Sequence, residues 1–196
     1  MTTRNSTVTR KTRETNVHLE LCLDGEGRAS IQTGVAFLDH MLENFTQHAG
    51  LDLSIQVQGD LHVDDHHSAE DVALCLGQAL DECLGNRAGI RRFGSAYAPL
   101  DESLARVVID FSGRPMACVD LGLKRERLGD LSCENIPHFL RSLASSARLT
   151  LHADVLRGEN DHHRAEASFK ALALALREAI TPTQQDRVPS TKGRLQ

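Results

Sequence analysis

The sequence lacks several features that mark whole classes of protein. Its net charge is −5 at pH 7, so it has no excess of the basic residues with which nucleic-acid binders displace counterions. No run approaches the roughly 18 apolar residues that a membrane-spanning helix needs. Residues 1–16 are polar, without the apolar core of a signal peptide. We therefore expect a cytoplasmic protein with neither membrane nor nucleic acid as a partner.

Cysteine is scarce and irregularly spaced. The five cysteines are odd in number, and none of them belongs to a C-x-x-C pair. This pattern argues against a disulfide framework or a zinc ribbon, and it favours buried thiols in a reducing compartment. With 40% apolar and 25% charged residues among 196, the chain can bury a core without disulfides.

The chain repeats itself. Residues 64–80 (DDHHSAEDVALCLGQAL) and 160–176 (NDHHRAEASFKALALAL) share a D-H-H-x-A-E motif, followed by an apolar helical pattern. Upstream segments also match in the same order and at nearly the same offset, namely 40–45 with 138–143 and 51–57 with 149–155. Several features repeated in one order predict an internal duplication.

We therefore predict an α+β fold made of two similar halves, each a small mixed sheet packed by two helices. The halves cover residues 10–97 and 98–182, and residues 183–196 form a polar C-terminal tail. The predicted order of elements in each half is β-β-α-β-α. Asp65 and Asp161 are the predicted N-cap residues of the second helix of each half, because Asp is a preferred N-cap.

Histidine is abundant, with ten copies, and its placement points to metal chemistry. At a helix start, His66 and His67 both lie within about one turn of Glu70, but adjacent helical residues diverge by about 100°. The two histidines are therefore better placed to serve two ions than one. The second repeat supplies an equivalent set, and each half adds one histidine on its first helix. The candidate metal ligands are His40, His66, His67, Glu70, His138, His162, His163 and Glu166.

Six imidazoles and two carboxylates provide four ligands for each of two ions. Such a set without thiolate suits Mn, Fe or a similar six-coordinate ion, and Zn is also compatible. Two positions on each ion stay open, as a catalytic metal requires. The duplication thus favours a two-metal enzyme, whereas a single H-H-x-x-E is as often an ordinary helix start. The histidines without a matching copy, which we interpret as ordinary, are His18, His48, His62 and His152.

Beyond the repeat, the sequence resembles the imidazoleglycerol-phosphate dehydratase family of histidine biosynthesis, from about residue 8 to the tail. The matching segments are RETN (13–16), FLDHML (37–42), DDHHSAED (64–71), IRRFGSAYAPLDE (90–102), DFSGRP (110–115), HFLRSLA (138–144), GENDHHRAEASFKAL (158–172) and PSTKG (189–193). The resemblance implies two split β-α-β halves, a homo-oligomer of 24 subunits, and two Mn²⁺ per active site at subunit interfaces. Its most specific parts are the paired D-H-H-x-x-E motifs and F-L-D-H-M-L.

The resemblance also implies a reaction and residue roles. Imidazoleglycerol phosphate loses water to give imidazoleacetol phosphate, through a metal-bound imidazolate and a diazafulvene. Glu14 falls on the acid that moves a proton, and Glu166 is a ligand that can also relay one. The contacts to the substrate phosphate fall on Arg92, Arg114, Lys170, Ser190 and Lys192. Asn44 stands where Gln is common, so its role is open.

Two other functions compete with this interpretation. A D-H-H-type metallophosphoesterase also uses Asp, His and Mn, but it needs several loop aspartates and has a single D-H-H motif. Phosphate release from a generic ester would favour it. A metal-storage or metal-sensing protein would bind metal without a phosphorylated ligand, and it would not need the basic set of Arg92, Arg114, Lys170 and Lys192.

Overall fold

The computed structural model describes residues 4–185, 187–191, 193 and 195. Within them the elements in chain order are β1 Asn5–Lys11, β2 Thr15–Cys22, β3 Ala29–Gln32, α1 Ala36–Ala49, β4 Asp52–Gly59, α2 His66–Leu84, β5 Phe93–Leu100, β6 Ser103–Asp110, β7 Met116–Asp120, β8 Arg127–Leu128, β9 Leu131–Ser132, α3 Asn135–Ser146, β10 Thr150–Arg157 and α4 Asp161–Ala179. None of the helices in this described part is both long and apolar enough to cross a membrane.

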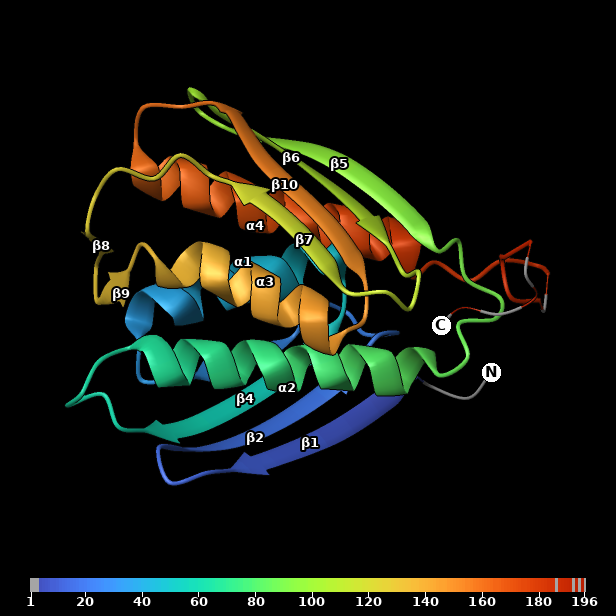
Figure 1. The fold of residues 1–196 in the computed structure, drawn as a ribbon, viewed down its shortest axis with the longest axis horizontal. Coiled ribbons are helices and arrows are strands. Elements are labelled where there is room, and N and C mark those ends of the chain that lie inside the picture. The colour runs from blue at the N-terminus through green and yellow to red at the C-terminus, as the bar shows by residue number, and fades with distance from the viewer. Residues whose placement is uncertain (1–3, 186, 192, 194, 196) are drawn as a thin grey trace.

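Two four-stranded sheets form the outer layers of the molecule, and the helices lie between them (Figure 1). The strand orders are β1-β2-β4-β3 and β5-β6-β10-β7. In both sheets the first three strands are antiparallel, and the fourth pairs in parallel, β3 with β4 and β7 with β10. The two sheets thus have the same topology, which confirms the α+β fold built from two similar halves.

The helices pack across the two halves. The second helix of each half covers its own sheet, since α2 contacts β1 and β2 while α4 contacts β5 and β6. The first helix of each half contacts the edge strand of its own sheet, β3 for α1 and β7 for α3, and also packs on the second helix of the other half, α1 on α4 and α3 on α2. Their apolar faces, with Met41 and Leu76 fully buried, join in one continuous core. This packing of helices across the two halves decides which histidines lie close together.

The boundary between the halves can be placed from strand pairing. Every residue of β5, from Phe93 to Leu100, pairs with β6 of the second sheet. We therefore propose to divide the halves just before β5 rather than within it. Residues 183–196 follow α4 and, where described, contain neither helix nor strand.

One predicted N-cap is confirmed in position and the other is wrong. Asp65 is the N-cap residue of α2, but its side chain makes no capping hydrogen bond. Its carboxylate accepts hydrogen bonds from Ser132 and Asn135 of the second half, and Asp64 accepts from the His66 N–H, at 2.6 Å. Asp161 lies inside α4, whose cap is Asn160. Local propensity favoured Asp as a cap. Both aspartates are buried, however, and their carboxylates accept hydrogen bonds from backbone N–H groups that are distant in sequence.

A short hairpin that the sequence did not predict, β8–β9, precedes α3 and caps another helix. The first residue before α1 is Val35, whose side chain cannot accept a hydrogen bond. Asp130 in the hairpin turn accepts instead, from the N–H groups of Ala36 at 2.6 Å and Phe37 at 2.9 Å. A carboxylate at a helix N-terminus is stabilising because it satisfies free N–H groups and complements the helix dipole.

Asp130→Ala is expected to lower the free energy of unfolding by about 1 kcal/mol, the usual effect of losing an N-cap. The measurement is urea denaturation of the metal-free protein. Asp120→Ala, an exposed position at the end of β7, is the matched control and should change stability little. Equal stability of the Asp130 variant and the parent protein would show that water caps α1 as well as the carboxylate does.

Candidate metal centre

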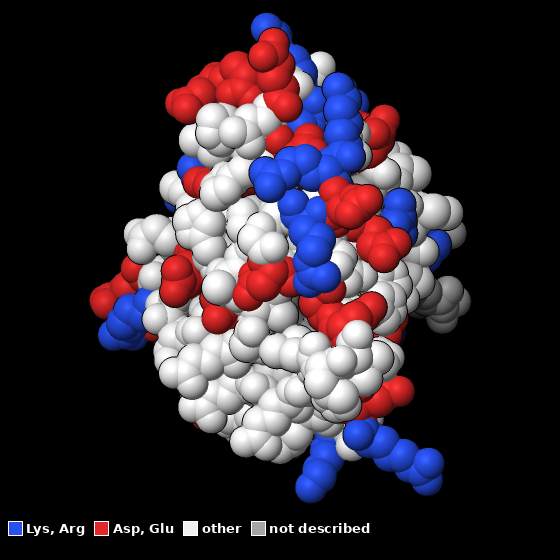
Figure 2. Space-filling view, turned by 90° about the vertical axis from the view of Figure 1, so that its left-hand side faces the viewer, with Lys and Arg blue, Asp and Glu red and all other residues white. Residues whose placement is uncertain are grey.

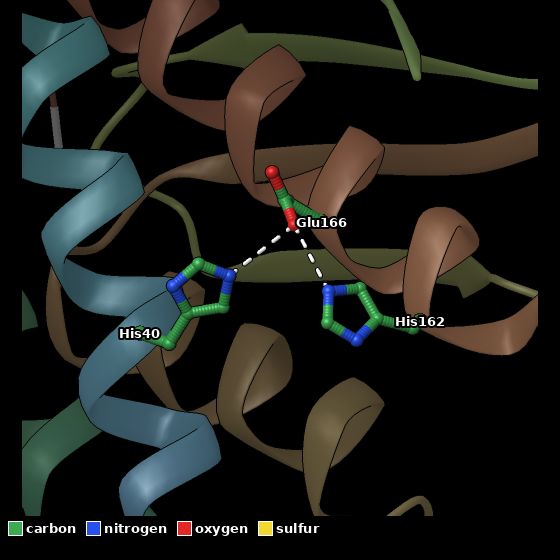
Figure 3. A group of neighbouring side chains, drawn as sticks. All are labelled: His40, His162 and Glu166. Carbon is green, nitrogen blue, oxygen red and sulfur yellow. Dashed lines mark hydrogen bonds and ion pairs between the residues drawn. The ribbon is translucent and has the colours of Figure 1, made fainter. Parts of the chain in front are cut away.

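The first candidate site joins α1 to the start of α4. His40 comes from α1, and His162 and Glu166 come from the first turns of α4, one turn apart (Figure 3). The carboxylate oxygen Oε2 of Glu166 lies 3.3 Å from His40 Nε2 and 3.1 Å from His162 Nε2. The three side chains point toward one another, as the ligands of one ion must.

The second candidate site is the repeat counterpart of the first. His66 and Glu70 come from α2, and His138 comes from α3. His138 Nε2 lies 3.1 Å from Glu70 Oε1, and the rings of His66 and His138 stack with centroids 4.7 Å apart. The sequence predicted all six residues, and the cross-half packing of the helices explains how they divide into two groups.

The donor sets and spacing of both groups fit a divalent cation. In each group the nearest ligand atoms all lie within 4.8 Å of one another. Metal–ligand distances of about 2.0–2.2 Å place two ligands of one ion at most about 4.4 Å apart, so small side-chain shifts suffice. Each group supplies two imidazoles and one carboxylate, which suits a first-row transition metal and leaves positions open.

His67 and His163 lie beside these groups rather than within them. The ring of His67 is nearly perpendicular to that of His66, at 78°, and His163 stands at 85° to His162. His67 Nδ1 lies 3.1 Å from Asp60, and His163 Nδ1 lies 2.7 Å from Glu102. As expected for adjacent helical residues, the second histidine of each motif does not join the group of the first.

The carboxylates of Asp60 and Glu102 hydrogen-bond to these two rings and raise their pKa values. The hydrogen bond to Asp60 raises the pKa of His67, and the one to Glu102 raises the pKa of His163. In turn the Asn160 and Glu159 N–H groups and His163 lower the pKa of Glu102. A carboxylate at Nδ1 leaves Nε2 as the ligand atom, which is the usual arrangement of a metal-binding histidine.

Lys170 lies at the first group. Its ammonium is 2.7 Å from Glu166 Oε1, the carboxylate oxygen that does not face the histidines. Burial alone would raise the pKa of Glu166, but the hydrogen bonds and charge of Lys170, with the hydrogen bonds of His162 and His40, lower it. Within this chain the ammonium therefore contacts a candidate metal ligand.

Three of the other residues predicted to contact phosphate gather elsewhere, around the tail. A cavity of about 1900 Å³ is lined by Arg92, Arg114 and Ser190, among others. The Arg92 guanidinium donates to both oxygens of Asp110, at 2.6 and 3.0 Å, and to the Pro189 carbonyl at 2.8 Å. Lys192, the remaining predicted contact, lies outside the described residues.

Figure 1 shows the C-terminal tail at one end of the molecule and the starts of α2 and α4, where the two D-H-H motifs lie, at the other. The 19 residues of α4 span roughly 28 Å at 1.5 Å per residue. His162 lies at its start, whereas the Arg92 N–H donates to the carbonyl of Ala179 at its end, at 2.9 Å. One small substrate therefore cannot touch both regions of the same chain.

Glu14 lies beside His67. It follows β1 in the turn before β2, its side chain is 54% exposed, and its Oε1 is 3.7 Å from His67 Nε2. Its carboxylate is thus available at the molecular surface beside a histidine that belongs to neither group of this chain.

The sequence reasoning missed the residues that support the ligands, above all Asp60, Glu102 and Asn135. Each of the two carboxylates reaches its histidine from a loop. Glu102 ends the matching segment 90–102, but nothing in that segment indicated a contact with a histidine, and Asp60 belongs to no matching segment. Asn44, whose role was open, donates from its side-chain amide to the His40 carbonyl at 3.0 Å. Lys170 was detectable as a partner of Glu166, because residues four apart on a helix are neighbours.

Comparison with known proteins agrees with this geometry. A model of the imidazoleglycerol-phosphate dehydratase family matches residues 33–176. The imidazoleglycerol-phosphate dehydratase of Candida glabrata is 55% identical over 96% of this chain and 98% of its own length, and that of Komagataella pastoris is 52% identical over 98% and 97%. The crystal structure of the Staphylococcus aureus enzyme covers 91% of this chain and 99% of its own, with 41% identity and a TM-score of 0.83. The structure from Pyrococcus furiosus, in complex with (S)-C348, covers 96% and 100%, with 38% identity and a TM-score of 0.83. The chain therefore belongs to the imidazoleglycerol-phosphate dehydratase family, and it is a dehydratase, a hydro-lyase of histidine biosynthesis.

Proposed function

We propose that the chain removes water from imidazoleglycerol phosphate with two Mn²⁺ per active site, and that each active site is shared between copies of the chain. The observation that carries this proposal is the presence of two open three-ligand groups at one end of the chain. Each group holds one ion, and His67 or His163 of a neighbouring copy supplies a fourth ligand. All eight predicted ligands are then used.

The separation of the tail cavity from the metal groups supports sharing between copies. Because roughly 28 Å of helix separates them within one chain, the phosphate of a substrate bound at the ions must be held by another copy. Arg92, Arg114, Ser190 and Lys192 of that copy are the proposed phosphate contacts. Lys170 acts at the ion end instead, since it contacts Glu166.

Charge at the metal end suits contact between like copies. Figure 2 shows this end, where a column of basic side chains is flanked by acidic ones. Charges of both signs on one face allow identical surfaces to pair without net repulsion. We propose a closed homo-oligomer, with 24 subunits as in the family resemblance. In the described residues, which include all five cysteines, no cysteine forms a disulfide, in keeping with the proposed cytoplasmic location.

The reaction is difficult because the proton to be removed lies on a carbon beside no carbonyl group. Divalent cations held by the two groups would supply positive charge beside the imidazole ring of the substrate and so lower the pKa of the ring N–H. The ring electrons then expel the hydroxyl from the adjacent carbon, which gives a diazafulvene. Glu166 is the proposed relay that passes the ring proton to that hydroxyl, which leaves as water.

The diazafulvene acidifies the neighbouring C–H bond, and Glu14 takes this proton. Return of that proton to a ring nitrogen gives the enol, which tautomerises to imidazoleacetol phosphate. Glu14 is the proposed base because it is exposed and lies 3.7 Å from His67, which completes the site of a neighbouring copy. Contacts to the phosphate at the far end of the substrate hold the reacting carbons in place.

The decisive experiment is a dehydratase assay on metal-stripped protein to which Mn²⁺ is added back. The proposal expects no ketone product without metal, and product formation that returns with Mn²⁺. Full turnover after exhaustive metal removal would refute the two-ion scheme. Release of inorganic phosphate in place of the ketone would favour the metallophosphoesterase.

Arg114→Gln is expected to raise KM for the phosphorylated substrate by about tenfold or more, the effect of losing one charge-assisted hydrogen bond worth about 1.5–3 kcal/mol. Its kcat should change less. Arg141→Gln, an exposed arginine on α3 outside the tail cavity, is the matched control. An unchanged KM in the Arg114 variant would remove the tail cavity from substrate binding.

A further inference from the structure

A buried amide supports one histidine of the second metal group. Asn135, at the start of α3 and 3% exposed, has its Oδ1 3.0 Å from His66 Nδ1. Its Nδ2 lies 3.0 Å from Asp65 Oδ2. The same oxygen of Asp65 accepts the backbone N–H of Ser132 at 2.6 Å. Asp65, Asn135 and His66 thus form a chain of hydrogen bonds that ends at a candidate ligand.

The chain of hydrogen bonds fixes the proton on His66. Asp65 Oδ2 acts as an acceptor, because a backbone N–H can only donate. The atom of Asn135 that faces it must therefore be the NH₂ group, which turns the amide oxygen toward His66. An amide oxygen only accepts, so His66 Nδ1 must carry the hydrogen, and Nε2 keeps the lone pair that binds an ion.

The duplication provides an internal comparison. Asn135 lies three residues before His138, and Phe37 lies three residues before His40, the repeat counterpart of His138. Phe37 contacts His162, the counterpart of His66, by an edge-on ring contact with centroids 5.1 Å apart. The two groups therefore differ at one matched position. An amide hydrogen-bonds the histidine in one group, and an aromatic ring packs against it in the other.

The carboxylates of the two groups differ as well. Lys170 lies four residues after Glu166 and pairs with it, at 2.7 Å. The counterpart position after Glu70 is Leu74, which carries no charge. A cation that binds at Glu166 must share the carboxylate with an ammonium group, whereas Glu70 has no such competitor on its own helix. Both differences favour tighter cation binding at the group of His66, Glu70 and His138.

We propose that the two metal groups are inequivalent, and that Asn135 is a positioning residue which makes the group of His66, Glu70 and His138 the tighter of the two. The inference rests on the proposed function only in requiring that both groups bind a divalent cation. Partners that orient a ligating histidine typically change metal affinity by about 10- to 100-fold. The tighter group is then filled first as the metal concentration rises.

The test is a titration of metal-stripped full-length protein with Mn²⁺, in which free Mn²⁺ is followed by its electron paramagnetic resonance signal. Two classes of site are expected, with dissociation constants at least about tenfold apart. Crystals grown with one Mn²⁺ per chain should then show the anomalous peak mainly between His66, Glu70 and His138. Equal peaks at the two groups would overturn the inference, and no peak at either would instead refute the proposed two-ion function.

Variants show which residue causes the difference in Mn²⁺ affinity between the two groups. Asn135→Leu, which keeps the volume but cannot accept a hydrogen bond, should weaken the tighter class about tenfold or more. Phe37→Leu, at the matched position, should leave that class unchanged, and Lys170→Met should tighten the weaker class. If the dissociation constant of the tighter site were unchanged in Asn135→Leu, Asn135 would not be the cause of the tighter binding. The titration and the crystals of the parent protein decide inequivalence even if that variant fails to fold.

Discussion

Glu166→Gln is expected to lower kcat by about 100-fold or more, the usual scale for removing one electrostatic group from a reacting centre. The carboxylate oxygen Oε2 lies 3.1–3.3 Å from both histidines of its group, so it is the only anionic ligand offered there by those three residues. A neutral amide binds a divalent cation poorly, and it leaves the Lys170 ammonium beside the site without its counter-charge. Bound Mn²⁺ should also fall, by about one ion per chain.

The matched control is Glu178→Gln on the same helix. Glu178 lies at the far end of α4, where it pairs with Arg91 at 3.2 Å and accepts the Ser95 N–H at 2.9 Å. Its loss should change stability slightly and turnover little. Near-normal turnover and full Mn²⁺ content in the Glu166 variant would exclude this residue both as a ligand and as a proton relay.

Glu14→Gln is expected to reduce kcat by about 10²- to 10⁴-fold, the range for loss of a general base, with KM nearly unchanged. The reason is that glutamine keeps the shape of the side chain but cannot take a proton. Because Glu14 is not one of the eight proposed ligands, Mn²⁺ binding should stay intact, which separates this variant from Glu166→Gln.

Glu20→Gln on β2 is the matched control for Glu14, since it is an exposed glutamate on the same hairpin. Steady-state kinetics and bound Mn²⁺ are measured on both variants. Turnover within a few-fold of the parent protein would remove Glu14 from the mechanism, and another acid would then have to move the proton.

The repeat indicated which residues are candidate ligands, but not which of them lie together. The duplicated D-H-H-x-x-E motif singled out His66, His162 and their neighbours, and a helix period of 3.6 residues correctly separated each adjacent pair. Which histidine meets which glutamate depends on the packing of α1 on α4 and of α3 on α2. Contacts between helices so distant in sequence leave no mark in local periodicity.

The same limit explains why neither aspartate caps its helix with its side chain. Asp65 and Asp161 stand where a helix cap is expected, and only tertiary structure brings backbone N–H groups of the second half to them, from Ser132 for one and from Lys124 and Arg125 for the other. The β8–β9 hairpin escaped prediction for another reason. Its strands have two residues each, too few to show alternation.

The packing of each first helix on the second helix of the other half has a consequence for how such a chain could arise. A polypeptide with only the first half would own His40, His66 and Glu70, yet its first helix would need a second helix from elsewhere to complete a group. Two identical short polypeptides docked face to face would regenerate both groups by symmetry. After fusion of the two into one gene, the two halves would no longer need the same sequence. Only then could one metal group acquire a lysine, Lys170, and the other an asparagine, Asn135.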